Sequence, residues 1–351
     1  MPRHIHIFYR TLLWLLVGFL LVACSGPTKN ESDQTLIQKP VWPKPPAQAR
    51  IEFVQNIAKP EDVGITPGFW SRLASIFVGK KETRLIRPTA AVITSDEVLF
   101  VADPGLKVVH RFDLRRKRHE MLQLSKNDTF RSPVALTIDA ANDQVYVSDS
   151  ALNRLYVLDK QSEDVIPFQT SIELDQPTGL AFDPQRGRLY VVNTRQHRVD
   201  VFNRQGELQF TIGSRGAGKS QFNYPTQIWC DPVNGELWIT DSLNFRVQRF
   251  SEKGEFISTF SGAGDATGNL PRPKGVATDR SGHVYIVDAL LNNLQIFNAN
   301  GELLLYLGEQ GREIGQFWLP VGIYIDSNNR IYVADSFNNR VQVFRYLEDK
   351  G

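Results

Sequence analysis

The chain has 351 residues, of which 42% are hydrophobic and 22% are charged, and these ordinary proportions exclude wholesale disorder. Its 40 Lys and Arg residues stand against 38 Asp and Glu residues, so it lacks the basic excess of nucleic-acid-binding proteins and we expect no nucleic-acid partner. Two cysteines are too few for a disulfide framework, a Cys-rich zinc site or a Cys-x-x-Cys-His haem attachment.

The N-terminus has the pattern of an export signal. Two arginines precede an apolar run over residues 12–23, which is too short to span a bilayer with ease. The sequence Leu21–Cys24 (LVAC) resembles the bacterial lipobox, in which the cysteine is acylated and the preceding segment is removed. The resemblance implies a signal peptide over residues 1–23 and a lipid anchor on Cys24. An uncleaved anchor helix with an incidental cysteine is the alternative, and it would also tether the protein to a membrane.

The residues after the lipobox bear on localisation. Ser25, rather than an aspartate, follows the cysteine, which resembles the sorting signal for the outer membrane. We therefore expect the protein in the bacterial cell envelope, facing the periplasm or the surface. Residues 24–49 are polar and rich in proline, so we expect them to form an extended spacer between the lipid and the folded part of the chain.

Residues 84–346 repeat one unit six times, with a period of 44 to 48 residues. Each unit opens with a proline before a short apolar strand, and a second apolar strand ends on Asp or Asn fifteen or sixteen residues later. The opening prolines are Pro88, Pro133, Pro177, Pro225, Pro273 and Pro320. Short strands bounded by Gly, Asn and Asp turns predict an all-β fold, and the period fits one four-stranded propeller blade.

The fourth and sixth units carry the most regular pattern. They read FNYP and FWLP at the opening proline, then DSLNFRVQRF and DSFNNRVQVF after the second strand. These residues resemble the NHL repeat, and the resemblance covers about three quarters of the chain. It implies an NHL-type six-bladed β-propeller. The first unit departs most, because Pro-Gly-Leu-Lys follows its Asp103. Trp-Asp repeats are the rival, but their Gly-His and Trp-Asp marks are missing.

The sixth unit lacks a fourth strand, since only a tail of residues 347–351 follows its third. Arg50–Ile57 alternates like a strand, and we predict that it completes blade six as its outermost strand and so closes the ring. It belongs to a closing segment of residues 50–83, in which Gly68–Val78 is predicted to form a short amphipathic helix.

One motif matches a nucleotide-binding pattern. Gly213–Ser220 (GSRGAGKS) fits the phosphate-loop pattern GxxxxGK[ST]. A true phosphate loop needs a helix directly after it, because the free N–H groups at the helix start bind the phosphate. Here Pro225 follows closely and opens the next strand. We therefore predict a loop between blades that binds no nucleotide.

An aspartate ends the second strand in almost every unit. A ring of carboxylates that binds metal is one interpretation. A side chain that recurs in nearly every blade, however, serves a need that every blade has, so we predict that these residues accept hydrogen bonds from turn N–H groups. The repeated aspartates are Asp103, Asp149, Asp241, Asp288 and Asp335.

Function is expected where a blade departs from the repeat, on the face that carries these loops. The candidate binding residues are Lys107, His110, Asn193, Arg195, His197, Gln227 and Lys274. The histidines are scattered without metal-ligand spacing, and no G-x-S-x-G motif occurs. We predict no catalytic residue, no metal and no cofactor.

These observations favour a non-catalytic, lipid-anchored binding or scaffold propeller that recognises an envelope protein or a glycan through its loops. The alternative is a lactonase- or lyase-like propeller enzyme with a metal at the central channel. No carboxylate occupies the positions after the six prolines, where such ligands are expected; these residues are Thr89, Val134, Thr178, Thr226, Lys274 and Val321. A third possibility is a passive brace in an envelope assembly.

Overall fold

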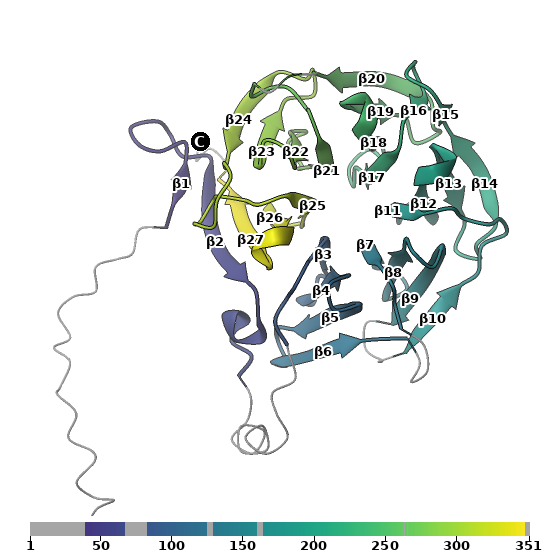
Figure 1. Cartoon of the computed structure of the whole chain (residues 1–351), viewed down its shortest axis with the longest axis horizontal. Coiled ribbons are helices and arrows are strands. Elements are labelled where there is room, and N and C mark those ends of the chain that lie inside the picture. The colour runs from purple at the N-terminus through teal and green to yellow at the C-terminus, as the bar shows by residue number, and fades with distance from the viewer. Residues whose placement is uncertain are drawn as a thin grey trace, which may run out of the picture. The chain divides into compact units, whose positions relative to one another are not determined.

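Each repeat forms an antiparallel sheet, and in the computed structural model six such sheets of described residues surround a central axis as blades (Figure 1). The structure describes residues 39–66, 83–124, 129–159, 164–262, 264 and 266–347. The predicted all-β, six-bladed propeller is thereby confirmed.

The strands of each blade follow one another from the axis outward. Blade one consists of β3 (Ala90–Ile93), β4 (Val98–Asp103), β5 (Val108–Asp113) and β6 (Arg118–Leu122). Blade two consists of β7 (Pro133–Asp139), β8 (Gln144–Asp149), β9 (Arg154–Asp159) and β10 (Val165–Phe168). Blade three consists of β11 (Pro177–Asp183), β12 (Arg188–Asn193), β13 (Arg198–Phe202) and β14 (Leu208–Ile212).

The remaining blades have the same order. Blade four consists of β17 (Pro225–Cys230), β18 (Leu237–Asp241), β19 (Arg246–Phe250) and β20 (Phe256–Ser261). Blade five consists of β21 (Pro273–Thr278), β22 (Val284–Asp288), β23 (Asn293–Phe297) and β24 (Leu303–Leu307). Blade six contains β25 (Pro320–Ile325), β26 (Arg330–Asp335) and β27 (Arg340–Tyr346).

Short elements lie in the connections. The strands β15 (Ser214–Arg215) and β16 (Gln221–Phe222) pair in parallel between blades three and four. Single 3-10 turns are η1 (Pro60–Val63), η2 (Thr194–Gln196), η3 (Ser242–Asn244) and η4 (Ser336–Asn338).

The hydrophobic core lies between neighbouring blades. The second strands β4, β18 and β22 are buried along their whole length, because a blade packs on each of their two faces. Between blades five and six, for example, Tyr285 and Leu294 pack with Ile331 and Phe344. The fourth strand is more exposed, as β24 illustrates.

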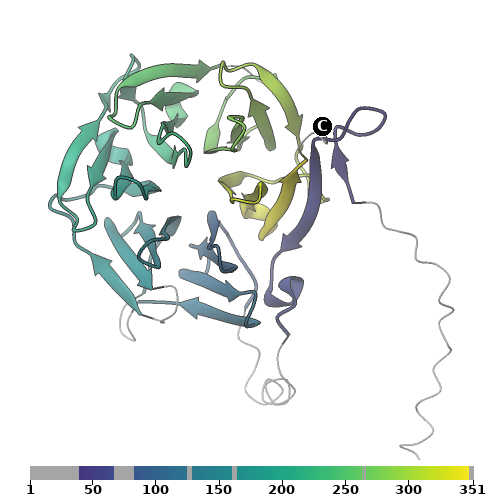
Figure 2. The same cartoon turned by 180° about the vertical axis from the view of Figure 1, so that it is seen from behind.

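The alternation of strand direction gives the ring two distinct faces. Pro133 at the start of β7 pairs with Asp149 at the end of β8, and the other blades repeat this register. The connections between second and third strands, and those between blades, therefore share one face, which we call the loop face. The turns from first to second strand and from third to fourth strand share the opposite face, which we call the turn face. Figures 1 and 2 view the ring from its two sides.

The ring is closed by a strand from the N-terminal part of the chain. The strand β2 (Ile51–Ile57) pairs with β27, from Ile51 opposite Tyr346 to Ile57 opposite Val341, as the sequence predicts (Figure 1). It is not the outermost strand, because β1 (Val41–Trp42) pairs with its far side. The indole of Trp42 packs edge-on against Phe344 with ring centroids 5.7 Å apart, which holds the added strand.

Several predicted segments lie outside the described residues. They are the signal peptide, Cys24 and the helix predicted at Gly68–Val78. In the described ranges, no helix is long and apolar enough to cross a membrane.

Candidate functional site

The repeated aspartates are buried on the loop face, where each accepts hydrogen bonds from the loop that leads into its own blade. Asp103 accepts bonds from the N–H groups of Ile86 and Arg87 at 2.7 and 3.0 Å. Asp149, Asp241, Asp288 and Asp335 accept equivalent bonds from Arg131, Asn223, Arg272 and Trp318. The side chains of these aspartates have no exposed surface.

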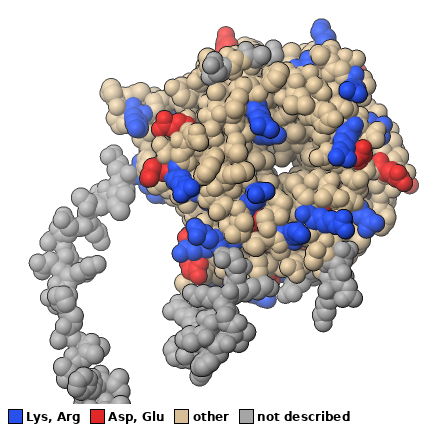
Figure 3. Space-filling model, in the orientation of Figure 1, with Lys and Arg blue, Asp and Glu red and all other residues tan. Residues whose placement is uncertain are grey.

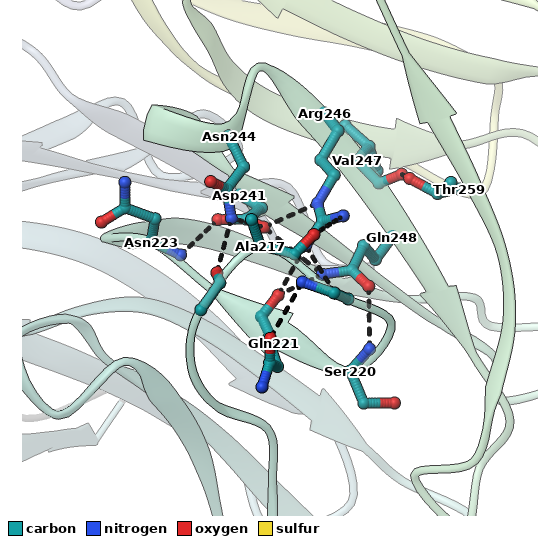
Figure 4. Close-up of polar contacts among 12 residues, drawn as sticks. Ala217, Ser220, Gln221, Asn223, Asp241, Asn244, Arg246, Val247, Gln248 and Thr259 are labelled. Carbon is teal, nitrogen blue, oxygen red and sulfur yellow. Dashed lines mark hydrogen bonds and ion pairs between the residues drawn. The ribbon is translucent and has the colours of Figure 1, made fainter.

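In blade four an arginine extends this network over the motif that resembles a phosphate loop (Figure 4). The Arg246 guanidinium donates to Asp241 at 2.8 Å and to the carbonyl oxygens of Ala217, Gly218 and Gln221. These carbonyl groups of the loop thus bind the Arg246 guanidinium of the protein itself. Blade six repeats the arrangement, with Arg340 bonded to Asp335 and to three loop carbonyls.

The N–H groups of the same loop are also bonded to the protein. Gly218 donates to the Gln221 side chain at 2.9 Å, and Ser220 donates to the Gln248 side chain at 3.2 Å. The strand β16 follows the motif directly, so no helix N-terminus is present there. Lys219 is exposed, and its ammonium group lies 5.6 Å from the ring centroid of Phe256. The loop therefore has none of the geometry with which a phosphate loop binds a nucleotide.

Three of the candidate binding residues are buried parts of their blades. His110 is fully buried, with its Nδ1 3.0 Å from the Nε2 of His119. Asn193 is fully buried in the position that aspartate occupies elsewhere, and its side-chain oxygen accepts a bond from the N–H of Asp175. His197 accepts a bond from the N–H of Tyr224 through Nδ1 at 3.2 Å. These side chains are not presented to a ligand on the loop face.

The other candidates are accessible but are not gathered into one site. Lys107 and Arg195 are exposed on the loop face, and Arg195 lies 3.7 Å from Asp175. Lys274 stands one residue after the opening proline of blade five, where burial and the neighbouring Arg272 lower its pKa. Gln227 lines a cavity in the central channel.

This cavity has a volume of about 830 Å³ and lies inside the ring of first strands. Its lining includes turn residues such as Ser95, Pro232 and Asn328, so it reaches the turn face rather than the loop face. Figure 3 shows that the molecule is hollowed at the centre of the ring on the face seen there. Three aromatic side chains contribute to the wall, namely Phe182, Trp229 and Tyr324.

Toward the loop face, hydroxyl groups join neighbouring blades around the channel. Thr178 donates to the carbonyl oxygen of Thr226 at 2.8 Å, and Ser242 donates to that of Pro273 at 2.6 Å. The residues directly after the opening prolines thus take part in hydrogen bonds that connect neighbouring blades. None of the six residues at these positions lines the cavity.

The carboxylates that line the cavity are engaged with partners. Asp279 bonds to His283 at 2.8 Å and thereby raises the pKa of that imidazole. Burial raises the pKa of the Cys230 thiol, which keeps it protonated at neutral pH. In the part of the chain that the structure describes, no group of three or more His, Cys, Asp or Glu side chains is arranged to hold a metal ion.

Sequence reasoning missed a feature of the loop face. The second residue after the repeated aspartate is apolar and exposed in blades four, five and six, where it is Leu243, Leu290 and Phe337. The equivalent residues of the first three blades are Gly105, Ala151 and Arg195. The alignment of the repeats contains this signal, but only the structure shows that these apolar side chains face solvent.

The comparisons with known proteins agree with this architecture. Residues 317–344 match the family model of the NHL repeat, and residues 164–263 match a family described as a 6-bladed beta-propeller. The fold and these matches define the protein as a six-bladed β-propeller. More particularly, the match to the NHL repeat model falls on residues 317–344, in and just before its sixth blade. No curated protein matches the sequence significantly.

Solved structures with a similar fold have diverse functions. Virginiamycin B lyase from Staphylococcus aureus is 14% identical with a TM-score of 0.56, over 75% of this chain and 96% of that one. An auxiliary nutrient binding protein from Bacteroides thetaiotaomicron is 13% identical with a TM-score of 0.60, over 76% and 71% of the two chains. Hydrazine synthase from Kuenenia stuttgartiensis is 15% identical with a TM-score of 0.52, over 78% and 99%. At these identities the likeness extends to the fold alone.

Proposed function

We propose that the protein is a non-catalytic binding propeller, anchored by a lipid in the bacterial cell envelope, that docks an acidic partner protein on its loop face. The observation that carries the proposal is the exposed apolar surface at the loop tips of blades four to six. We define this docking surface by residues that are 41% to 56% exposed: Tyr224, Leu243, Phe245, Leu290 and Phe337. Exposed apolar side chains at the loop tips of consecutive blades are typical of a protein interface.

Basic side chains surround the apolar ones. Arg87 lies over the ring of Phe337, 5.5 Å from its centroid, and Arg312 lies 5.4 Å from the centroid of Trp318. Arg272 is a further exposed cation at this face. The aspartates beneath are buried and hydrogen-bonded. The exposed carboxylates of the connection between blades five and six are Glu309 and Glu313, two against these three arginines. Aromatic and arginine side chains together are enriched in interface centres, and the charge favours an acidic partner.

An enzyme of the lyase or lactonase kind is the second candidate, and the likeness of fold to virginiamycin B lyase is what favours it. A metal assay on the purified full chain distinguishes the two. Stoichiometric calcium or zinc would support the enzyme, whereas the binding proposal needs no metal.

The docking surface is tested by polar substitution of its three loop tips. For the triple variant Leu243→Ser, Leu290→Ser, Phe337→Ser, we expect the amount of crosslinked partner recovered from native envelopes to fall at least about tenfold. Each substitution removes apolar contact area from the interface. The matched control is Ile257→Ser, which alters an exposed residue of the outer strand β20 and should leave recovery unchanged. Equal recovery with the triple variant and wild type would refute this surface.

The anchor is tested by Cys24→Ala. The substitution removes the only thiol that a lipobox peptidase pathway can acylate, so we expect the protein to leave the membrane fraction in detergent-free washes while its melting temperature stays unchanged. Membrane association that survives the washes would contradict lipid anchoring. Wild-type protein carried through the same fractionation is the reference.

A further inference from the structure

At one position of the repeat, the residues that line the cavity differ between blades. The fourth residue after the opening proline has the same register in every blade, opposite an aromatic residue of the second strand. At this level the other blades carry small or aliphatic side chains, whereas blades four and six carry Trp229 and Tyr324. Both rings are partly exposed, and both line the cavity. Both rings also pack against core residues between blades, and the small side chain of Ala277 leaves room at this level in the blade between them.

The two rings are held in fixed positions. The Trp229 indole N–H donates to Thr278 Oγ1 at 2.8 Å, and that hydroxyl donates to Asp231 Oδ2 at 2.7 Å. Trp229 and Tyr324 meet edge to face, with ring centroids 5.7 Å apart and planes at 70°. A rigid aromatic wall can bind a ring without first losing side-chain entropy, which is the usual requirement for a preorganised site.

Polar groups of the wall remain available beside the rings. The side chains of Gln227 and Thr137 line the cavity and make no hydrogen bond with another described residue. The carboxylates at the turn-face mouth are instead paired, as in Glu97 with Arg115 at 3.4 Å and Asp326 with Arg330 at 2.7 Å. The arrangement therefore offers neutral donors and acceptors rather than uncompensated negative charge. Arg280 is exposed at the same mouth and can donate to hydroxyl groups.

We infer that the channel cavity is a binding site for the sugar ring of a neutral glycan, entered from the turn face. A pyranose ring presents C–H groups on its faces, which pack on aromatic rings, and hydroxyl groups at its edge, which need amide and hydroxyl partners. The cavity volume of about 830 Å³ lies in the usual range for small-ligand sites. This site is separate from the docking surface, so either can fail without the other.

In the experiment, the wild-type protein is titrated with maltohexaose, cellohexaose and chitohexaose, and binding is measured by calorimetry and by tryptophan fluorescence. We expect at least one of them to bind and to change the fluorescence. Trp229→Leu should then weaken binding at least about tenfold, whereas Trp229→Phe keeps an aromatic wall and should stay within about threefold of wild type. Gln227→Ala should weaken binding to an intermediate degree.

Matched controls separate this site from the rest of the molecule. Trp318→Leu removes an indole on the loop face and should leave sugar binding unchanged, as should the triple variant of the docking surface. Absence of binding by all three sugars at millimolar concentration would overturn the inference. Binding that Trp229→Leu leaves unchanged would overturn it as well, since the sugar would then sit elsewhere.

Discussion

A chain that lacks residues 50–57 is expected to lose its cooperative thermal unfolding transition. The deletion removes β2, leaves the edge of β27 unpaired and takes away part of the packing between blades six and one. It also removes Ile51 and Ile57, which are buried in two different core clusters. Calorimetry of the deleted and full-length chains measures the effect. A transition of unchanged midpoint and enthalpy would show that the ring does not depend on this strand.

Point substitutions in β2 give the same test without shortening the chain. Phe53 packs edge-on against Phe344 with ring centroids 5.9 Å apart, so Phe53→Ala should cost roughly 3 kcal/mol of the free energy of unfolding. Its neighbour Glu52 makes only a surface ion pair with Arg345 at 3.3 Å. Glu52→Ala is therefore the matched control, expected to cost less than about 1 kcal/mol.

The fold was predictable because its signals are local and recur. The opening proline and the closing aspartate of each second strand stand at a nearly constant spacing, and the structure pairs them directly, as with Pro225 and Asp241. The closing strand was also predictable, since an open blade needs an edge partner and Ile51–Ile57 alternates as such a strand does. The strand β1 was not, because two residues carry no periodicity.

The sites were less predictable, because they depend on which side chains the ring brings together across blades. Trp229 and Tyr324 are separated by a whole blade in sequence, and each alone resembles an ordinary strand residue. The sequence drew attention instead to rare residue types such as His110 and His197. The structure buries both: His110 contacts His119 of its own blade through Nδ1, and His197 accepts a bond from the N–H of Tyr224 in the connection to the next blade.

The loop Gly213–Ser220 gives the sharpest contrast between a motif and its physical role. Gly213 has a φ of 89°, a conformation that side chains with a Cβ rarely adopt, and a Cβ there would overlap the buried ring of Phe222. Gly213→Val should therefore lower the free energy of unfolding by roughly 3 kcal/mol or more. Gly218→Ala is the matched control in the same loop, because its Cβ would meet only the flexible side chain of Gln221.

Substitution of Lys219 tests whether the same loop binds a nucleotide. A phosphate loop would use this lysine to bind the phosphates of ATP, so Lys219→Ala would abolish any stabilisation by ATP and magnesium. In the structure the side chain is exposed and contacts only the Phe256 ring among the interactions described, so Lys219→Ala should change stability by less than about 0.5 kcal/mol. Thermal melts of wild type, Lys219→Ala and Gly213→Val with and without ATP and magnesium measure both effects. We expect no ATP-dependent shift in any of them, because Gly218 and Ser220 already donate their N–H groups to Gln221 and Gln248. A shift in wild type that disappears in Lys219→Ala would instead establish a nucleotide site.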